Sequence, residues 1–304
     1  MPGSGDLLAD RRFAYAEASF EDGDFAAAAD LARQVLELAP GYAPAWFLLG
    51  KSFVEAGADR AEAVSAFRSA LAHDPADVLG AKLRLAQLGA ADPHGAMSPA
   101  YVRELFDEYA IRFDRHLRQS LRYRGPEVLL DGVRRACSRR LAPVRFAAAL
   151  DLGCGTGLAA ELFRPVCQHL AGVDLSPAMV KRAAAKKLYD ELAVGDLTGW
   201  LAGRPERSAD LVLAADVFVY VADLRPVFAG VAAALRPDGL FAFTVQAHAG
   251  EGVVLGDDQR YAHAEAYLRE VTADVGLTPA VVEPCTTRQD RGADVPGLLM
   301  VAGC

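Results

Sequence analysis

The stretch FAAALDLGCGTGLAAELF, residues 146–163, decides the fold of this chain. Its apolar run 146–150 leads into Asp151, and glycines then occupy every second position up to residue 157. The glycines of this turn are Gly153, Gly155 and Gly157. The order is typical of a buried β-strand, a tight turn and a helix that begins near residues 156–158, so it predicts the strand–turn–helix unit of an α/β sheet.

Two kinds of cofactor turn compete for this segment. The dinucleotide fingerprint GxGxxG requires glycine at position 158, where Leu158 stands, so a nicotinamide dehydrogenase is disfavoured. The alternative pattern Asp-x-Gly-x-Gly-x-Gly runs from Asp151 to Gly157 and resembles motif I of the class I S-adenosylmethionine (SAM) methyltransferases. Glycines allow the backbone to approach the methionyl part and the ribose of SAM, and an acid at the strand end can receive its α-ammonium group. The resemblance implies SAM as the cofactor.

Further acids follow at the ends of the next predicted strands. Asp174 lies 23 residues after Asp151, Asp196 lies 22 residues after Asp174, and Asp216 ends an apolar run at about 210–215. In doubly wound sheets an acid at the place of Asp174 meets the ribose hydroxyls, and the methyltransferase resemblance implies that Asp196 binds the adenine amine. Each acid alone is compatible with simple turn chemistry. Their succession after a glycine turn favours a SAM site.

The expected cofactor site takes in these acids, the glycines and their neighbours, and no metal is expected in it. Its members are Asp151, Gly153, Gly155, Gly157, Asp174, Leu175, Met179, Asp196, Leu197, Asp216 and Tyr109. Downstream, the pattern predicts a strand at 240–246, a helix at about 262–275 and closing strands at about 277–286 and 297–303. Residues 144–304 are therefore expected to form a Rossmann-like, doubly wound, seven-stranded methyltransferase sheet.

The first ninety residues contain an internal repeat. Pro40 and Pro75 are 35 residues apart, and Gly23 and Gly57 are 34 apart. One unit resembles the tetratricopeptide repeat (TPR), in which small residues allow paired helices to approach and proline ends the second helix. The residues that carry this resemblance are Trp46, Leu49, Gly50, Phe53, Ala63, Phe67, Ala70 and Pro75. The repeats predict an all-α module at 1–92, with a third helix at about 77–89 as its cap.

Residues 93–143 read as a helical linker and lid before the sheet. Apolar residues recur there at steps of three and four from Val102 to Leu117, and Gly125-Pro126 opens another helix. The segments 102–129 and 260–270 resemble a bacterial family of TPR-containing methyltransferases. That resemblance implies the cofactor and the reaction type but not the acceptor. Gln246 departs from it, because relatives are expected to carry an acid there.

Composition excludes several classes of protein. The net charge is −8, although residues 91–145 carry 11 Arg against seven acids, so no nucleic-acid partner is expected. Five cysteines without CxxC spacing disfavour a disulfide framework and a thiolate zinc site and fit a reducing compartment. Neither a secretory signal nor an apolar run of 18 residues is visible, so no membrane association is expected. The expected location is the cytoplasm.

The acceptor side is expected on a short loop after the strand at 240–246. Arg260, Tyr261 and His263 place a cation, a phenol and an imidazole there, with His263 as general base and Arg260 as holder of an anionic acceptor. The alternative is that His263 only caps a helix, and then His116, His248 and Tyr109 are the next candidates. The expected function is methyl transfer from SAM to oxygen, nitrogen or carbon of a small metabolite.

Two other functions remain open at this stage. One is a protein methyltransferase recruited through the TPR module, and the other is a catalytically silent SAM-binding scaffold. The module itself fits either a groove for a protein partner or a packing element, including one that forms a homodimer. Turnover of SAM separates an enzyme from a scaffold.

Overall fold

The structure, a computed structural model, describes residues 3–290 and 292–304. The chain forms two compact units, one that ends at Tyr101 and one that begins at Val102. No helix in the described part of the chain is long and apolar enough to cross a membrane. The two units are described separately.

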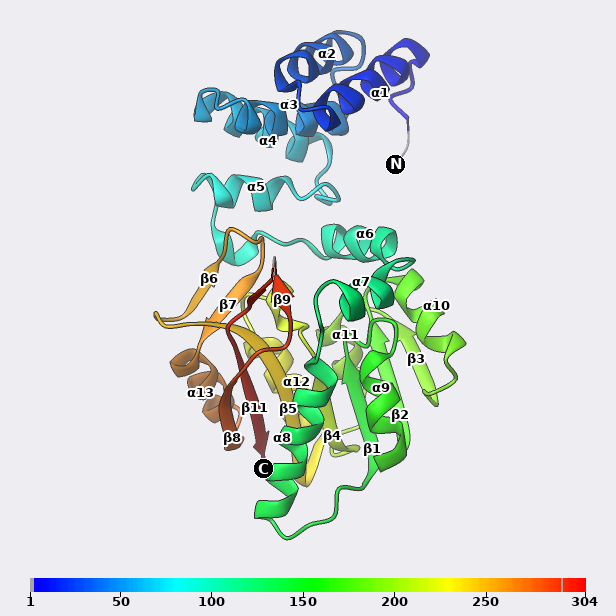
Figure 1. The fold of residues 1–304 in the computed structure, drawn as a ribbon, viewed down its shortest axis with the longest axis vertical. Coiled ribbons are helices and arrows are strands. Elements are labelled where there is room, and N and C mark those ends of the chain that lie inside the picture. Colours follow the sequence, from blue (N-terminus) through cyan, green and yellow to red (C-terminus); the bar gives the residue numbers. More distant parts are fainter. Residues whose placement is uncertain (1–2, 291) are drawn as a thin grey trace. The chain divides into compact units, whose positions relative to one another are not determined.

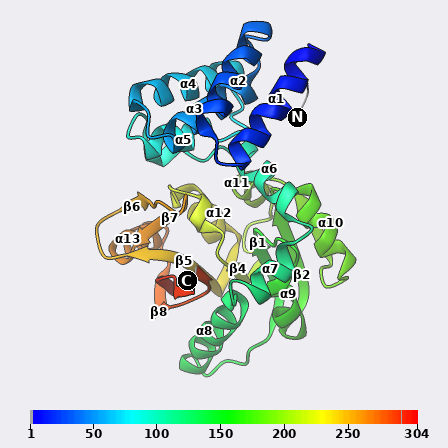
Figure 2. The same ribbon diagram turned by 45° about the horizontal axis from the view of Figure 1, so that its top comes forward.

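The N-terminal unit consists of helices that pack against one another in chain order (Figure 2). Aspartates begin three of the long helices, because the carboxylates of Asp6, Asp24 and Asp59 accept hydrogen bonds from free backbone amides of the first turn. The elements are α1 (Leu7–Glu21), α2 (Phe25–Leu38), α3 (Ala43–Glu55), α4 (Arg60–His73), α5 (Ala81–Gln87) and the short η1 (Pro93–Gly95).

Helices α3 and α4 approach closely where the sequence predicts small residues. A Cβ atom on Gly50 would lie 2.8 Å from the ring of Phe67, and Ala63 is almost fully buried. Helix α5 is shorter than the expected 77–89, because Asp77 and Gly80 adopt left-handed backbone with φ of +56° and +77°. The carboxylate of Asp77 accepts a hydrogen bond from the amide of Ala81 at 2.6 Å, which fixes the start of the helix.

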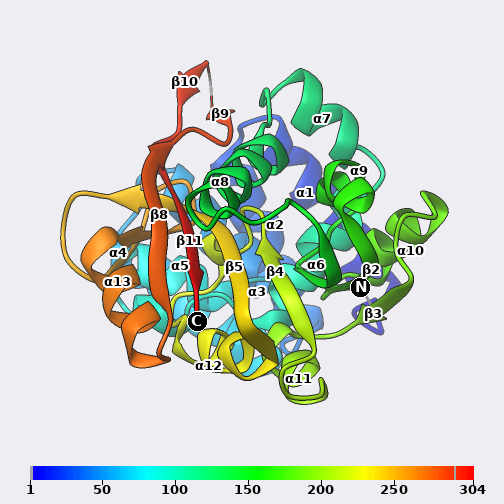
Figure 3. The ribbon, with the colours of Figure 1, turned by 90° about the horizontal axis from the view of Figure 1, so that it is seen from below.

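The C-terminal unit is built on a mixed sheet in the order β3-β2-β1-β4-β5-β11-β8 (Figure 3). Strands β1 to β5 pair in parallel, and β11 is antiparallel to both β5 and β8. The seven expected strands and their Rossmann-like order are confirmed. Their bounds are β1 (Phe146–Leu152), β2 (Cys167–Asp174), β3 (Glu191–Val194), β4 (Ala209–Ala214), β5 (Leu235–His248), β8 (Thr278–Cys285) and β11 (Gly297–Gly303).

Two short strands extend the sheet beyond the expected seven. Strand β7 (Tyr261–Ala264) pairs in parallel with the end of β5, and β6 (Val253–Leu255) pairs with β7. The helix that was expected to begin near residue 262 begins only at α13 (Glu265–Asp274). The backbone groups of residues 246–248 would otherwise lack partners, and they pair with those of residues 262–264. This strand pairing prevails over the helical pattern of the sequence. A small hairpin joins β9 (Gln289–Asp290) to β10 (Ala293–Asp294).

Helices cover both faces of the sheet (Figures 1 and 3). Leu211 and Leu213 of β4 face the core shared with α8 (Gly125–Arg139) and α9 (Leu158–Phe163), which η2 (Arg164–Val166) continues. Val212, between them, faces the core of the opposite layer. That layer consists of α11 (Leu197–Ala202), α12 (Arg225–Ala234) and α13. The alternation explains why β4 is apolar on both sides.

The segment before the sheet is divided into more helices than the sequence pattern predicts. Helix α6 (Pro99–Tyr109) begins where the hydroxyl of Ser98 accepts a hydrogen bond from the amide of Tyr101, as the Ser-Pro signal predicts. The chain then turns at residues 110–112 and continues as α7 (Phe113–Gln119). After this turn α7 lies beside α9, and α6 contacts the first turn of α10 (Pro177–Ala185).

Candidate cofactor and acceptor site

The glycine turn after β1 uses left-handed backbone at all three glycines. The φ angles of Gly153, Gly155 and Gly157 are +62°, +54° and +84°. A Cβ atom on Gly153 would also lie 2.6 Å from the side chain of Val217, which is in the loop that follows β4. The turn therefore exposes backbone at the carboxyl edge of the sheet, where ligands of this fold class lie.

Asp151, the acid before the turn, is buried and held by a tyrosine. It is 1% exposed, and its Oδ2 atom accepts a hydrogen bond of 2.6 Å from the hydroxyl of Tyr189. Burial raises the pKa of Asp151 to about 7, and the hydrogen bond from Tyr189 opposes that rise. A buried carboxyl of this kind gains charge when a cation binds beside it. Tyr189 lies between α10 and β3, and no sequence pattern pointed to it.

Asp174 ties the glycine turn to the end of β2. Its Oδ2 atom accepts a hydrogen bond from the amide of Gly155 at 2.8 Å, and its Oδ1 atom accepts one from the amide of Ser176 at 2.9 Å. Burial raises the pKa of this carboxyl, and the two amides oppose the rise. A carboxylate has about four acceptor positions. Turn formation therefore leaves Asp174 able to accept hydrogen bonds from a ligand as well.

The remaining cofactor candidates differ in how accessible they are. Asp196 is exposed and caps α11, with Oδ1 accepting from the amide of Gly199 at 2.8 Å. Leu175 and Leu197 are partly buried at the ends of β2 and β3. Met179 is fully buried in the first turn of α10, so it acts on a ligand only through packing.

The segment of α6 and α7 is fastened over the glycine turn. The Oδ1 atom of Asp107 accepts hydrogen bonds from the hydroxyl of Ser176 at 2.5 Å and from the amide of Ala178 at 3.1 Å. Asp114 accepts a hydrogen bond from the hydroxyl of Thr156 inside the turn. Phe113 is the side chain nearest to a Cβ built on Gly155, at 3.9 Å. These contacts place the segment as a cover of the candidate cofactor site.

The carboxylate of Asp216, which follows β4, is hydrogen-bonded to other side chains of this chain. It has left-handed backbone with φ of +55°, and its carboxylate accepts hydrogen bonds from the hydroxyls of Thr244 and Thr287. The guanidinium of Arg288, which is 5% exposed, donates to Asp216 at 3.2 Å and to Oε1 of Gln246 at 2.6 Å. The side chain of Val217, rather than the carboxylate of Asp216, therefore lies against the glycine turn. Sequence reasoning missed Thr287 and Arg288.

The expected loop of Arg260, Tyr261 and His263 is not a loop, because Tyr261 and His263 lie in β7 and are buried. His263 is fully buried, and its Nε2 atom lies 3.0 Å from the carbonyl oxygen of Val221. Burial lowers the pKa of His263 to about 4, so the ring is neutral at pH 7 and donates to that carbonyl. A general base needs access to its substrate, and this position does not provide it. The strand pairing of residues 261–264 is the physical reason for this correction.

Arg260 remains at the edge of the site. Its side chain is 27% exposed and lies 4.0 Å from Oδ2 of Asp258. Burial opposes the charge, but the hydroxyl of Tyr220 and the nearby acids outweigh it and raise the pKa of Arg260. The ring of Tyr220 in turn packs edge-on against Phe106 of the cover, with centroids 5.1 Å apart. Tyr220, after the end of β4, and Arg260, just before the start of β7, therefore both lie near the cover.

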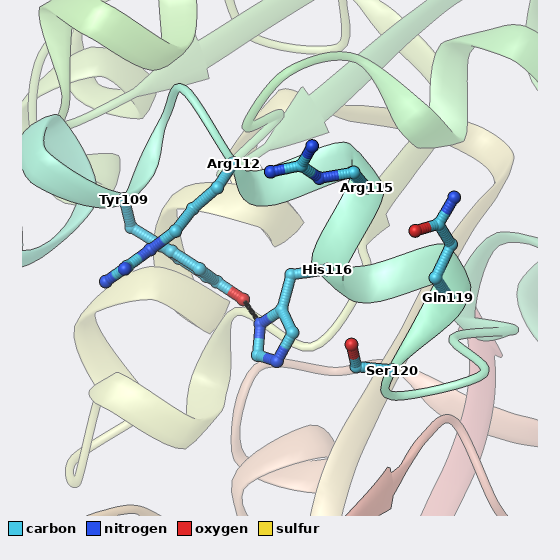
Figure 4. A pocket seen from close by; sticks show the side chains of 6 residues that line it. All are labelled: Tyr109, Arg112, Arg115, His116, Gln119 and Ser120. Atoms are coloured by element: carbon cyan, nitrogen blue, oxygen red, sulfur yellow. Dashed lines mark hydrogen bonds between the residues drawn. The ribbon is translucent and has the colours of Figure 1, made fainter.

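A pocket of about 480 Å³ opens at the turn between α6 and α7 (Figure 4). The hydroxyl of Tyr109 is hydrogen-bonded to Nδ1 of His116 in its wall. Tyr109 was expected to cover the cofactor; its hydroxyl lies in the wall of this pocket, and its ring packs edge-on against Phe113 of the cover. The lining residues are Tyr109, Arg112, Arg115, His116, Gln119 and Ser120.

Comparisons with known proteins identify relatives of the region that contains the sheet. Residues 150–243, from the end of β1 to β5, match the family model of a methyltransferase domain. This segment is therefore similar to methyltransferase domains. The chain is 36% identical to human methyltransferase-like protein 27 over 40% of its length and 48% of the relative's. It is 34% identical to trans-aconitate 2-methyltransferase of Pseudomonas aeruginosa over 40% of its length and 41% of the relative's.

The chain spans less than half the length of these curated relatives. Solved methyltransferases share the fold of the C-terminal unit at low identity. The 1,6-didemethyltoxoflavin-N1-methyltransferase of Burkholderia thailandensis superposes with a TM-score of 0.51 at 19% identity, covering 70% of this chain and 90% of its own. Magnesium protoporphyrin IX methyltransferase of Synechocystis gives 0.50 at 17% identity, with 67% and 96% covered. These two matches show the fold alone.

Proposed function

We propose that the chain is a SAM-dependent methyltransferase that transfers a methyl group to oxygen, nitrogen or carbon of a small-molecule acceptor. The observation that carries this proposal is the succession of acids along one edge of the sheet. Asp151 and Asp174 lie at the ends of β1 and β2, Asp196 follows β3 as the cap of α11, and the left-handed glycine turn lies between the first two in the chain. SAM supplies the electrophilic methyl group on its sulfonium when it is bound.

The residues at this edge fit the three polar parts of SAM. The buried carboxyl of Asp151 suits the α-ammonium group, because a cation there removes the cost of ionising a buried acid. Asp174 has acceptor positions left for the ribose hydroxyls, and the exposed carboxylate of Asp196 suits the adenine amine. The glycine turn allows the backbone to approach the methionyl part and the ribose.

The acceptor belongs at the edge of the sheet where β4 and β5 end and β7 begins. Tyr220, Gln246 and Arg260 are the polar side chains at this place, and α6 with α7 covers it against water. Methyl transfer is a displacement at carbon, so the chain's task is to align the two reactants and exclude solvent. Because His263 is closed off, an acceptor that needs no general base is favoured.

A carboxylate oxygen meets that condition, since it is ionised at neutral pH. The names of two relatives support this choice. One is trans-aconitate 2-methyltransferase, and another, 29% identical over 42% of this chain, is the malonyl-[acyl-carrier protein] O-methyltransferase of Serratia marcescens.

The N-terminal unit supports a second candidate, a protein methyltransferase recruited through TPR repeats. The close approach of Gly50 to Phe67 and the burial of Ala63 are the packing that the TPR resemblance implies. Such a helical array is suited to holding an extended segment of a partner protein.

One experiment distinguishes these functions. The full chain is incubated with SAM carrying a labelled methyl group, first with a low-molecular-weight cell extract and then with the protein fraction. Label in small molecules supports the proposal, and label in protein supports the second candidate. Binding of SAM without transfer in either fraction would establish a scaffold. Asp174→Ala, which removes a proposed ribose contact, serves as the negative control.

A further inference from the structure

The pocket between α6 and α7 is lined by hydrogen-bond donors and by no carboxylate. Among the described residues, neither Arg112 nor Arg115 forms an ion pair. The basic side chains next to them are neutralised, because Arg118 pairs with Glu161 at 2.6 Å and Lys186 pairs with Asp114 at 3.0 Å. Two guanidinium groups therefore stand without a counter-charge in a chain whose net charge is −8.

The tyrosine in the wall occupies one of the two ring nitrogens of His116. Burial raises the pKa of Tyr109, and its hydroxyl is hydrogen-bonded to Nδ1 of His116. In the tautomer that accepts at Nδ1, the imidazole carries its proton on Nε2. In the described part of the chain this Nε2–H group has no hydrogen-bond partner. The imidazole lines the same pocket as Arg112 and Arg115, and Figure 4 shows its free nitrogen turned away from the hydroxyl of Tyr109.

The donors are held by residues of the cofactor cover. The guanidinium of Arg112 lies over the ring of Tyr109, 5.5 Å from its centroid, and that ring packs edge-on against Phe113 at 5.2 Å. Phe113 is the side chain that faces Gly155 in the glycine turn. The hydroxyl of Tyr109 also lies within electrostatic range of Tyr220 and Arg260. The wall of the pocket thus adjoins both the cofactor turn and the acceptor side.

We infer that this pocket binds an anionic group of the acceptor, a carboxylate or a phosphate, through Arg112, Arg115 and Nε2–H of His116. Arginine forks suit the paired oxygens of either group, and the absence of a lining carboxylate among the residues named above leaves the charge of these groups available. The role as acceptor site rests on the proposed methyltransferase function. The binding of an anion does not.

The test measures anion binding to the full chain saturated with S-adenosylhomocysteine, by calorimetry. The probes are citrate for carboxylates, inorganic phosphate for phosphates and triethyl citrate as a neutral analogue of citrate. We expect citrate or phosphate to bind, triethyl citrate not to bind, and affinity to fall as ionic strength rises. The anion that binds more tightly identifies the chemical group. Binding of neither anion would overturn the inference.

Variants locate the binding within the molecule. The pair R112Q/R115Q should weaken the anion by about tenfold or more and leave S-adenosylhomocysteine affinity unchanged, since lost charged hydrogen bonds have this magnitude. The pair R103Q/R134Q removes the same charge from exposed positions of α6 and α8 outside the pocket, and it should leave anion affinity within about twofold. Equal effects of the two pairs, or no effect of the first, would overturn the inference.

A further variant tests the histidine. His116→Gln keeps a side-chain N–H donor and should retain more anion affinity than His116→Phe, which keeps none. Equal affinity of the two would remove His116 from the site and with it the three-donor arrangement. Failure of S-adenosylhomocysteine to bind would instead contradict the proposed function. The anion titrations, repeated without it, would still decide the inference.

Discussion

The hydroxyl of Tyr189 lies 2.6 Å from Oδ2 of the buried Asp151 and holds the acid that begins the cofactor turn. The same ring limits the turn, because a Cβ on Gly157 would meet it at 3.1 Å and one on Gly172 at 2.8 Å. One side chain from outside the motif therefore stabilises the ionised form of the acid and limits the space around Gly157 of the turn and Gly172 of β2. Two consequences for cofactor binding can be measured.

Binding of S-adenosylhomocysteine should depend on pH through Asp151. The pKa of this carboxyl is raised to about 7 in the free protein. In the proposed function its ionised form binds the α-ammonium group. Affinity should therefore fall by about tenfold per unit as pH drops below 7 and level off between 7 and 8. Calorimetry in two buffers of different ionisation enthalpy should show proton release near pH 6. Asp151→Asn should lose both the release and the pH dependence, and an unchanged profile would contradict the assignment.

Tyr189→Phe should move that profile toward higher pH. The hydroxyl donates to the ionised form of Asp151 and opposes the rise of its pKa, so its removal raises the pKa further. A hydrogen bond to a charged group has a strength that corresponds to about one pH unit. Tyr15→Phe, at an exposed tyrosine of the N-terminal unit, is the matched control. A midpoint that stays in place would mean that Tyr189 only packs against the turn.

Asp174→Ala should weaken the binding of SAM by about 1.5–3 kcal/mol, the scale of lost hydrogen bonds to a charged group. The variant removes acceptors for ribose hydroxyls and also releases the amides of Gly155 and Ser176. Asp131→Ala, at an exposed acid of α8, controls for the loss of charge. Affinity can be measured by calorimetry and the free energy of unfolding by denaturant titration. Unchanged affinity with lowered stability would mean that Asp174 stabilises the turn and does not bind SAM.

The sequence predicted the features that depend on neighbouring residues. Alternating glycines after an apolar run require one backbone path, and the structure confirms it with three positive φ angles after β1. The expected seven strands are present, and β1, β4 and β11 show the clearest signal, a continuous apolar run. Gly50 is another local success, since its packing against Phe67 follows from the repeat pattern.

The features that the sequence did not predict depend on contacts between residues that are distant in the chain. Tyr189 meets an acid 38 residues away, and Thr287 and Arg288 meet Asp216 across 71 and 72 residues. No periodicity links such positions. The helix predicted to begin at about residue 262 was wrong for a related reason. The pattern AHAEAYL at 262–268 suits a helix, and only pairing with the end of β5 makes its first part a strand.

His263 should prove to be a residue of stability and not of catalysis. Its pKa is lowered to about 4 by burial, whereas an unfolded histidine titrates near 6.5. The unfolded chain therefore takes up a proton first as pH falls, so stability is lost between pH 6.5 and 4, by roughly 3 kcal/mol in total. His263→Asn should reduce this loss in urea titrations at pH 7 and pH 5, and it should lower the free energy of unfolding at pH 7. His73→Asn, at an exposed histidine that ends α4, should change neither the loss nor the stability at pH 7. A general base would behave otherwise, because its removal lowers turnover by about 10²–10⁴-fold with the fold intact. That result, in a variant as stable as the parent, would restore His263 to the reaction.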